Sequence, residues 1–205
     1  MAKFPWPPPI DHLRRVAPEH HTLPSGSLVA RIYGRGGRHP SAWNDFRFTG
    51  PLAGARFDHH ADAEQRGVLY GARSLTTCVA EVFQATRVVD RSIDDRRLAA
   101  FRLVRGVRLL DLTGDWPTRA GASQAMASGP RTRAQAWARA IYEGYPSVEG
   151  LWYPSSMHGG HPALVLFERS TDALPADPDL DVPLSHPGLL PDLVRAANAL
   201  GYLIR

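Results

Sequence analysis

The segment GVLYGARSLTTCVAEVF, residues 67–83, predicts a short β-strand that leads directly into a helix. Residues 68–70 are apolar, β-branched or aromatic and lie between two glycines, which is how short strands are commonly bounded. Ser74 provides an N-cap, because its hydroxyl can accept a hydrogen bond from a free N–H group of the first helical turn. We therefore expect a helix that begins at Leu75.

One acidic residue of this helix lies close to its apolar stripe. At about 100° per residue, the expected stripe comprises Leu75, Val79, Val82, Phe83 and Thr86. Glu81 lies beside this stripe, neither on it nor opposite to it. A carboxylate in that position can line a cleft while the helix stays anchored in the core, although a solvated glutamate is the simpler alternative.

Composition indicates a single globular domain. The chain has 205 residues, of which 43% are hydrophobic and 21% are charged, and a domain of this size buries roughly 70% of the surface that its unfolded chain exposes. Cys78 is the single cysteine, so we expect a buried thiol, no disulfide framework and a reducing, cytoplasmic location. The sequence contains neither a signal-peptide core nor a run of about 20 apolar residues, which favours a soluble protein that is neither exported nor inserted in a membrane.

The charge pattern disfavours nucleic acid as a direct partner. The formal net charge is +4, but the arginines are dispersed, acidic residues nearly match them, and Lys3 is the single lysine. Arginine binds phosphate groups through paired hydrogen bonds, so an anionic small molecule fits this composition. The loop GRGGRHP, residues 34–40, lacks the Lys-Ser/Thr pair of a P-loop. His59 and His60 have no second ligand pair at helical spacing, so no metal is expected.

The remaining pattern mixes strands and helices without a regular βαβ alternation, which predicts an α+β fold. Residues 1–26 form a proline-rich leader with a helical turn at 10–17, and residues 27–205 form one domain with a C-terminal helical extension from about residue 170. Strands are expected at 28–33, 98–104, 107–112, 148–153 and 163–167, with the second and third paired as a hairpin. Helices are expected at 133–142 and 189–200, the latter ended by Gly201, and 116–130 is expected to be a loop.

The order of the unusual residues resembles the RES domain family, which is named for its Arg, Glu and Ser. Those residues are Arg31, Arg56, Tyr70, Glu81 and Ser155. The strongest matching segments are LYGARSLTTCVAEVF at 69–83 and GLWYPSS at 150–156, the second followed by a glycine-rich turn and ALVLF. The occurrence of both segments in this order in one chain makes the resemblance more specific than either segment alone.

The resemblance implies a core like that of the ADP-ribosyltransferases, with two small mixed sheets and flanking helices around an NAD cleft. It implies an NAD-degrading toxin of a bacterial toxin–antitoxin pair, with an Xre-type antitoxin that covers the active site. NAD is then the substrate, no metal is required, and water or phosphate accepts the ADP-ribosyl group.

The roles that this resemblance suggests follow from the chemistry of NAD cleavage. Glu81, Arg31 and Ser155 would be catalytic, with Glu81 stabilising the positive charge that develops on the ribose. Arg56 and Tyr70 would bind NAD, Arg56 together with Arg31 at the diphosphate and Tyr70 at the nicotinamide, while the Ser155 hydroxyl would bond to ribose or phosphate.

Each assignment has an alternative. Arg31 and Arg56 could be structural ion-pair partners, Tyr70 a core residue, and Ser155 the cap of a turn. A protein ADP-ribosyltransferase would use the same site with a protein acceptor. A non-catalytic interaction module that kept the fold is the third function class, and self-association into a homo-oligomer stays open.

Overall fold

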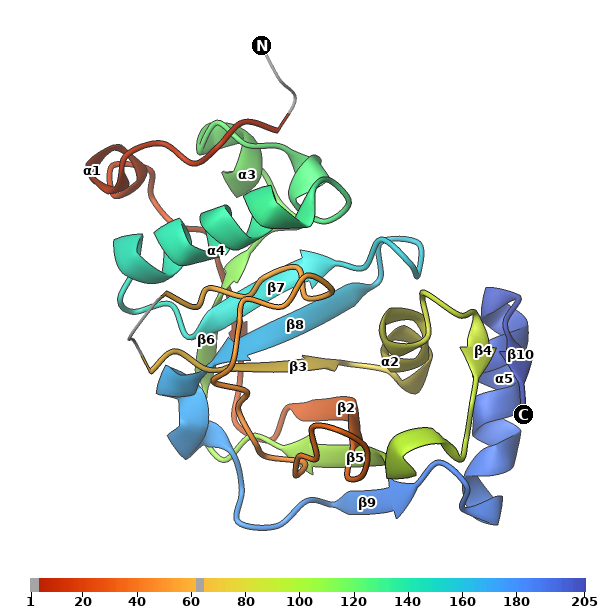
Figure 1. Ribbon diagram of the computed structural model, residues 1–205. Coiled ribbons are helices and arrows are strands. Elements are labelled where there is room, and N and C mark those ends of the chain that lie inside the picture. The colour runs from red at the N-terminus through yellow and green to blue at the C-terminus, as the bar shows by residue number, and fades with distance from the viewer. Residues whose placement is uncertain (1–3, 62–64) are drawn as a thin grey trace.

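The computed structural model describes residues 4–61 and 65–205. Its main element is a mixed eight-stranded sheet (Figure 1). Its strand order is β1-β6-β7-β8-β3-β2-β5-β9, and β6 and β7 are its parallel pair. These strands span His20–Leu23 (β1), Leu28–Gly34 (β2), Val68–Ala72 (β3), Arg96–Arg102 (β5), Val107–Asp111 (β6), Gly150–Pro154 (β7), Pro162–Phe167 (β8) and Leu180–Pro183 (β9). Strands β4 (Val88–Val89) and β10 (Leu203–Ile204) form a separate parallel pair.

The helices cover different parts of this sheet. They are α1 (Ile10–Leu13), α2 (Leu75–Val82), α3 (Trp116–Arg119), α4 (Arg131–Gly144) and α5 (Leu190–Leu200), with 3-10 turns at Ile93–Asp95, Gln124–Met126, Glu168–Ala173 and Pro187–Leu189. Helices α1, α3 and α4 lie over the strands β6, β7 and β8, whereas α5 lies beside β4 and β10 (Figure 1). The predicted α+β class is confirmed. Among the described residues, no helix is long and apolar enough to cross a membrane.

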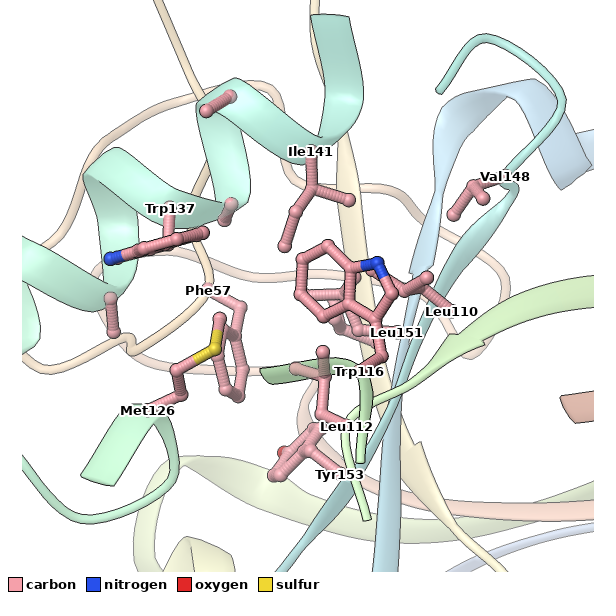
Figure 2. Close-up of a cluster of buried hydrophobic side chains, with 14 of the residues drawn as sticks. Phe57, Leu110, Leu112, Trp116, Met126, Trp137, Ile141, Val148, Leu151 and Tyr153 are labelled. Atoms are coloured by element: carbon pink, nitrogen blue, oxygen red, sulfur yellow. The ribbon is translucent and has the colours of Figure 1, made fainter. Parts of the chain in front are cut away.

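Alternating side chains of the strands supply different core clusters. Figure 2 shows the cluster under α4, where Trp137 and Ile141 of the helix pack with Leu110 of β6 and Leu151 of β7. The neighbouring strand residues, such as Leu109, point to the opposite face and join a second cluster. A third cluster packs α2 and α5 against β2 and β5. The protein therefore has one apolar layer under α4, a second on the opposite face of the same strands, and a third under α2 and α5.

The large sheet consists of two halves that are joined at a single residue pair in the described chain. Strand β3 pairs with β2 only at Ala30 and Ala72, whereas β2 pairs with β5 over its whole length. Gly71 permits this approach, since a Cβ atom there would lie 2.9 Å from Val29 Cγ1 and 3.0 Å from the Ala30 carbonyl oxygen. We expected two small sheets. In the structure this contact instead joins a five-stranded half, which ends at β3, to a three-stranded half, which begins at β2, in one sheet.

A loop segment fills the wedge that opens where β2 and β3 diverge. Arg47 pairs with Val68 of β3 through two backbone hydrogen bonds of 2.9 and 3.1 Å. On the other side, Arg31 of β2 donates through Nη1 to the carbonyl oxygens of Trp43 and Asp45, both at 3.0 Å. Arg31 thus ties this segment to β2.

The N-terminal leader is part of the packed structure. Phe4 is buried in the cluster under α4, and the Trp137 indole N–H donates to the Pro5 carbonyl at 2.9 Å. The helical turn expected at 10–17 is present as α1, but it ends at Leu13. Strand β1, which the sequence analysis did not predict, pairs with β6 and adds an edge to the sheet.

The structure corrects several other expectations. Strands β5 and β6 do not form the predicted hairpin, because β5 is occupied on both sides by β2 and β9, and β6 by β1 and β7. The α2 helix ends at Val82, which lies 36% exposed instead of on the buried stripe, and Thr86 follows the helix. The segment expected to be a loop at 116–130 contains α3, with Trp116 fully buried. Strand β9 was not predicted.

The other elements agree with their sequence patterns. Helix α4 extends the predicted helix by two residues at each end, and β7 and β8 form an antiparallel pair around the expected glycine-rich turn. Helix α5 ends at Gly201, whose φ of 65° is the left-handed conformation typical of a helix C-terminus.

A partly buried carboxylate fastens the end of β8 to the start of β3. Glu168 accepts hydrogen bonds from the Gly67 N–H at 2.9 Å and from the Tyr142 hydroxyl, and His59 Nε2 lies 3.5 Å away. Burial alone would raise the pKa of Glu168, but the nearby His59 and the hydrogen bonds from Tyr142 and Gly67 outweigh burial and lower the pKa to about 2.

We predict that Glu168→Gln loses a pH-dependent part of the stability. Because the folded pKa is below the unfolded value, this contribution is complete above pH 4.5 and disappears as the pH falls towards 2. Urea unfolding should show a deficit of roughly 3 kcal/mol at pH 7 that shrinks in acid, whereas Asp177→Asn, at an exposed carboxylate, should show none. A deficit in unfolding free energy that is as large in acid as at pH 7 would contradict the prediction.

Candidate active site

A cavity of about 230 Å³ lies between the α4 layer and the α2 layer, beside the junction of β2 and β3. Helix α2, the ends of β3 and β7, and the loop before Phe57 form its walls. The lining residues include Arg31, Ile32, Ala55, Arg56, Tyr70, Gly71, Cys78, Glu81, Val82, Gln84, Arg131, Tyr153 and Ser156. Four of the five predicted site residues therefore line one cavity, and the fifth, Ser155, lies directly behind it.

Helix α2 holds the glycine-rich loop after β7 from two points, one helical turn apart. Ser74 caps the helix as predicted, since its hydroxyl accepts from the Thr77 N–H. Thr77 and Glu81 then lie on the same face. Thr77 Oγ1 contacts His158 Nδ1 at 3.0 Å, and Glu81 Oε1 accepts from the Ser155 hydroxyl at 2.6 Å.

Ser155 organises both its own loop and the Glu81 carboxylate. Its side chain is 1% exposed, and its Oγ accepts from the N–H groups of Met157 and His158 at 3.2 and 3.1 Å. Its hydroxyl proton is directed to Glu81. Ser155 is thus a turn cap, as the alternative interpretation held, and it also fixes the Glu81 carboxylate that lines the cavity. Its neighbour Ser156 faces the cavity.

The environment of Glu81 changes its acidity. Burial raises the pKa of this carboxyl above its usual 4.5, while the Ser155 hydrogen bond and the charges of Arg56 and Arg131 act in the opposite direction. A partly buried carboxylate with a raised pKa that lines a cavity is typical of functional sites. The alternative of a solvated glutamate does not fit this position.

The two predicted arginines have different surroundings. Arg56 donates through Nη1 to the Gly129 carbonyl oxygen at 2.6 Å, and its pKa is lowered by burial and by the nearby charge of Arg131. Burial lowers the pKa of Arg31 to about 10, against the attraction of Asp45, so Arg31 remains charged at neutral pH. Neither arginine forms an ion pair within the described chain, contrary to the structural alternative for both.

Tyr70 lines the cavity and also packs against the core cluster under α4, so it combines the expected site position with the core alternative, while its hydroxyl is engaged elsewhere. The hydroxyl donates to Asp58 Oδ1 at 3.0 Å and accepts from the Phe57 N–H at 3.0 Å. Asp58 is fully buried and paired with Arg47 at 2.6 Å. Burial, reinforced by the Asp58 charge, raises the pKa of Tyr70 well above 10. The ring is therefore fixed and the phenol stays neutral.

The thiol and the adjacent histidines have structural surroundings. Cys78 is buried as predicted, donates to the Ala30 carbonyl at 3.2 Å, and has its pKa raised by burial to about 12. His59 and His60 are buried outside the cavity lining. In the part of the chain that the structure describes, no three acidic, histidine or cysteine side chains are grouped to hold a metal ion.

Sequence reasoning missed several residues of the cavity. Arg131 is the first residue of α4, where a lone arginine resembles any solvated helix residue. Tyr153 lies inside the quoted segment GLWYPSS, but its alternation marked it only as a strand residue. Gln84 follows α2 and carries no pattern of its own.

Comparison with known proteins places the chain in a family. A model described as the RES domain matches residues 28–185, and the chain therefore belongs to the RES domain family. No curated protein sequence matches it. Among solved structures, its fold is similar to that in the crystal structure of the M. tuberculosis MbcT–MbcA toxin–antitoxin complex. The TM-score is 0.58 at 19% sequence identity, with 90% of this chain and 95% of that chain covered.

We predict that Ser155→Ala raises the pKa of Glu81 further, because the hydrogen bond that stabilises its charged form is lost. Two N–H groups of the turn also lose their acceptor, which should lower the free energy of unfolding by about 1–3 kcal/mol. Carboxyl ¹³C NMR titration, with Glu81→Gln to assign the resonance, measures the pKa. Ser156→Ala is the matched control and should leave the titration unchanged; an unshifted Glu81 in Ser155→Ala would contradict the assigned bond.

Proposed function

We propose that this protein cleaves the bond between nicotinamide and ribose of NAD and acts as the toxin of a bacterial toxin–antitoxin pair. The observation that carries the proposal is the Glu81 carboxylate, which borders the cavity, is fixed by Ser155 and faces two arginines. Membership of the RES family supports NAD as the substrate. The similarity to the MbcT–MbcA toxin–antitoxin complex supports the role as a toxin.

The reaction requires charge stabilisation more than an added cofactor. When the bond between C1′ and the pyridinium nitrogen breaks, the electron pair leaves with neutral nicotinamide and positive charge develops on the ribose. A fixed carboxylate close to that carbon lowers the energy of this state. Water or phosphate then adds to C1′ and releases a proton. Glu81 is the carboxylate for this step and also accepts from a ribose hydroxyl.

The other site residues position the reactants. The cation of Arg56 binds the substrate diphosphate, and the fixed ring of Tyr70 stacks on the nicotinamide. Ser155 acts through Glu81, because its single proton is committed to that carboxylate; a nucleophilic attack by Ser155 is not part of the proposal. Arg31 holds the 43–47 segment against β2 and adds positive charge to the cavity wall.

An antitoxin of the Xre type is the proposed protein partner. Val82 and Arg131 are exposed at the cavity, so a protein that covers them would also close the route to Glu81. Transfer of ADP-ribose to a protein is the alternative outcome at the same site, since the acceptor is whichever nucleophile reaches C1′. Labelled NAD with cell lysate distinguishes the two, because a labelled protein band requires transfer.

We predict that Glu81→Gln lowers nicotinamide release from NAD by on the order of 10²–10³-fold without unfolding the protein. Glutamine can still accept from Ser155, so the loss concerns the charge alone. Release should be measured with and without phosphate, which separates phosphorolysis from hydrolysis, alongside melting curves. Glu143→Gln, on α4 and paired with Arg66, is the control. Full activity of a folded Glu81→Gln protein would overturn the proposal.

The pH profile provides a separate prediction. Since only the ionised carboxylate stabilises the ribose cation and burial raises its pKa, the acid limb of kcat/KM should lie above pH 4.5. Arg56 lowers the Glu81 pKa, so Arg56→Gln should move this limb to higher pH in addition to reducing the rate. Initial rates between pH 4 and 8 test this, and an unmoved limb in Arg56→Gln would contradict the coupling.

A further inference from the structure

Arg131 is a cation of the cavity that has no assigned role. It is the first residue of α4, its side chain is exposed, and it lines the cavity together with Arg56 and Glu81. Within the described chain, its side chain makes one hydrogen bond, from Nη2 to Gln84 Oε1 at 3.3 Å. Most of the donors of its guanidinium are therefore available to a ligand.

Arg131 and Arg56 form a doubly positive pair. Arg131 is close enough to Arg56 to disfavour its charge, and both arginines favour the charge of Glu81. Glu81 is held by Ser155, and neither arginine has an ion-pair partner in the described residues. Within the described part of the chain, Arg56 and Arg131 therefore have a single carboxylate, Glu81, near them, and Glu81 forms an ion pair with neither. The positive charge of the two guanidinium groups is not neutralised by an ion pair with any described residue, and an anion bound between them would neutralise it.

Arg31 is a weaker candidate for the same anion. The sequence analysis paired Arg31 with Arg56 at the diphosphate. The structure instead commits Arg31 Nη1 to two backbone carbonyl groups of the 43–47 segment. Arg56 makes one such bond, to Gly129, and Arg131 makes none to the backbone among the described residues.

We propose that Arg131 is a substrate-binding residue, which together with Arg56 binds the diphosphate of the dinucleotide at the mouth of the cavity. The proposal rests on the proposed function and extends it. A diphosphate carries two negative charges and presents paired oxygens that match the planar fork of arginine. Bound there, it places the attached ribose next to Glu81. The exposed Arg131 meets the ligand first, and the half-buried Arg56 holds it deeper in the cavity.

The experiment uses the full chain and ADP-ribose, a probe that retains the diphosphate but cannot be cleaved at the nicotinamide bond. Calorimetry should show a Kd about tenfold or more weaker for Arg131→Gln, with a smaller loss for Arg131→Lys, which retains the charge without the fork. The salt dependence of Kd should decrease in Arg131→Gln. Arg195→Gln removes an exposed arginine of α5 outside the cavity and should match the wild type. In turnover, Arg131→Gln should raise KM for NAD and leave kcat nearly unchanged.

The outcomes separate this inference from the proposed function. If Arg131→Gln binds ADP-ribose like the wild type, or loses kcat at constant KM, the role of Arg131 is overturned while NAD cleavage by the wild type still stands. If the wild type binds ADP-ribose but releases no nicotinamide, the variants still decide the role of the pair. If the wild type neither binds nor cleaves, both proposals fail.

Discussion

The structure depends on the close contact between β2 and β3 at Ala30 and Ala72. Beyond that pair the two strands separate, and their backbone groups need other partners, because buried N–H and C=O groups are rarely left unpaired. The 43–47 segment supplies them for β3 through Arg47, and the Arg31 guanidinium satisfies two carbonyl groups of the same segment. The cavity exists because the two halves of the sheet carry separate helical layers that meet beside this junction.

Helix α2 connects the junction to the chemistry. It has eight residues, too few for stability on its own, and it is held by tertiary contacts. Cys78 bonds to the Ala30 carbonyl at the junction, while Thr77 and Glu81 hold the loop after β7. Burial disfavours the charged form of Glu81, and the two neighbouring arginines disfavour each other's charge, so neither effect favours folding. Such local conflict with stability is expected where a site is organised for a ligand.

Local patterns predicted the elements that carry the site, including the Ser74 cap, the position of Glu81 and the strands around the glycine-rich loop. They failed where pairing is non-local: β5 and β6 look like a hairpin, but partners distant in sequence occupy both. The exposure of Val82 also has a tertiary cause. Its position on the apolar stripe of α2 predicted a packed neighbour, but Val82 borders the cavity instead. No local signal marks Arg131, since its proximity to Arg56 arises only when α4 packs beside the 54–56 loop.

The leader has a consequence for where this domain begins. Phe4 packs under Gly129, where any side chain would meet the Phe4 ring at 2.9 Å, and the Gly129 carbonyl holds Arg56. The family match covers residues 28–185 and so omits this buttress, as well as β1 and α5. One wall of the cavity is therefore supported by a residue outside the segment that the family model matches.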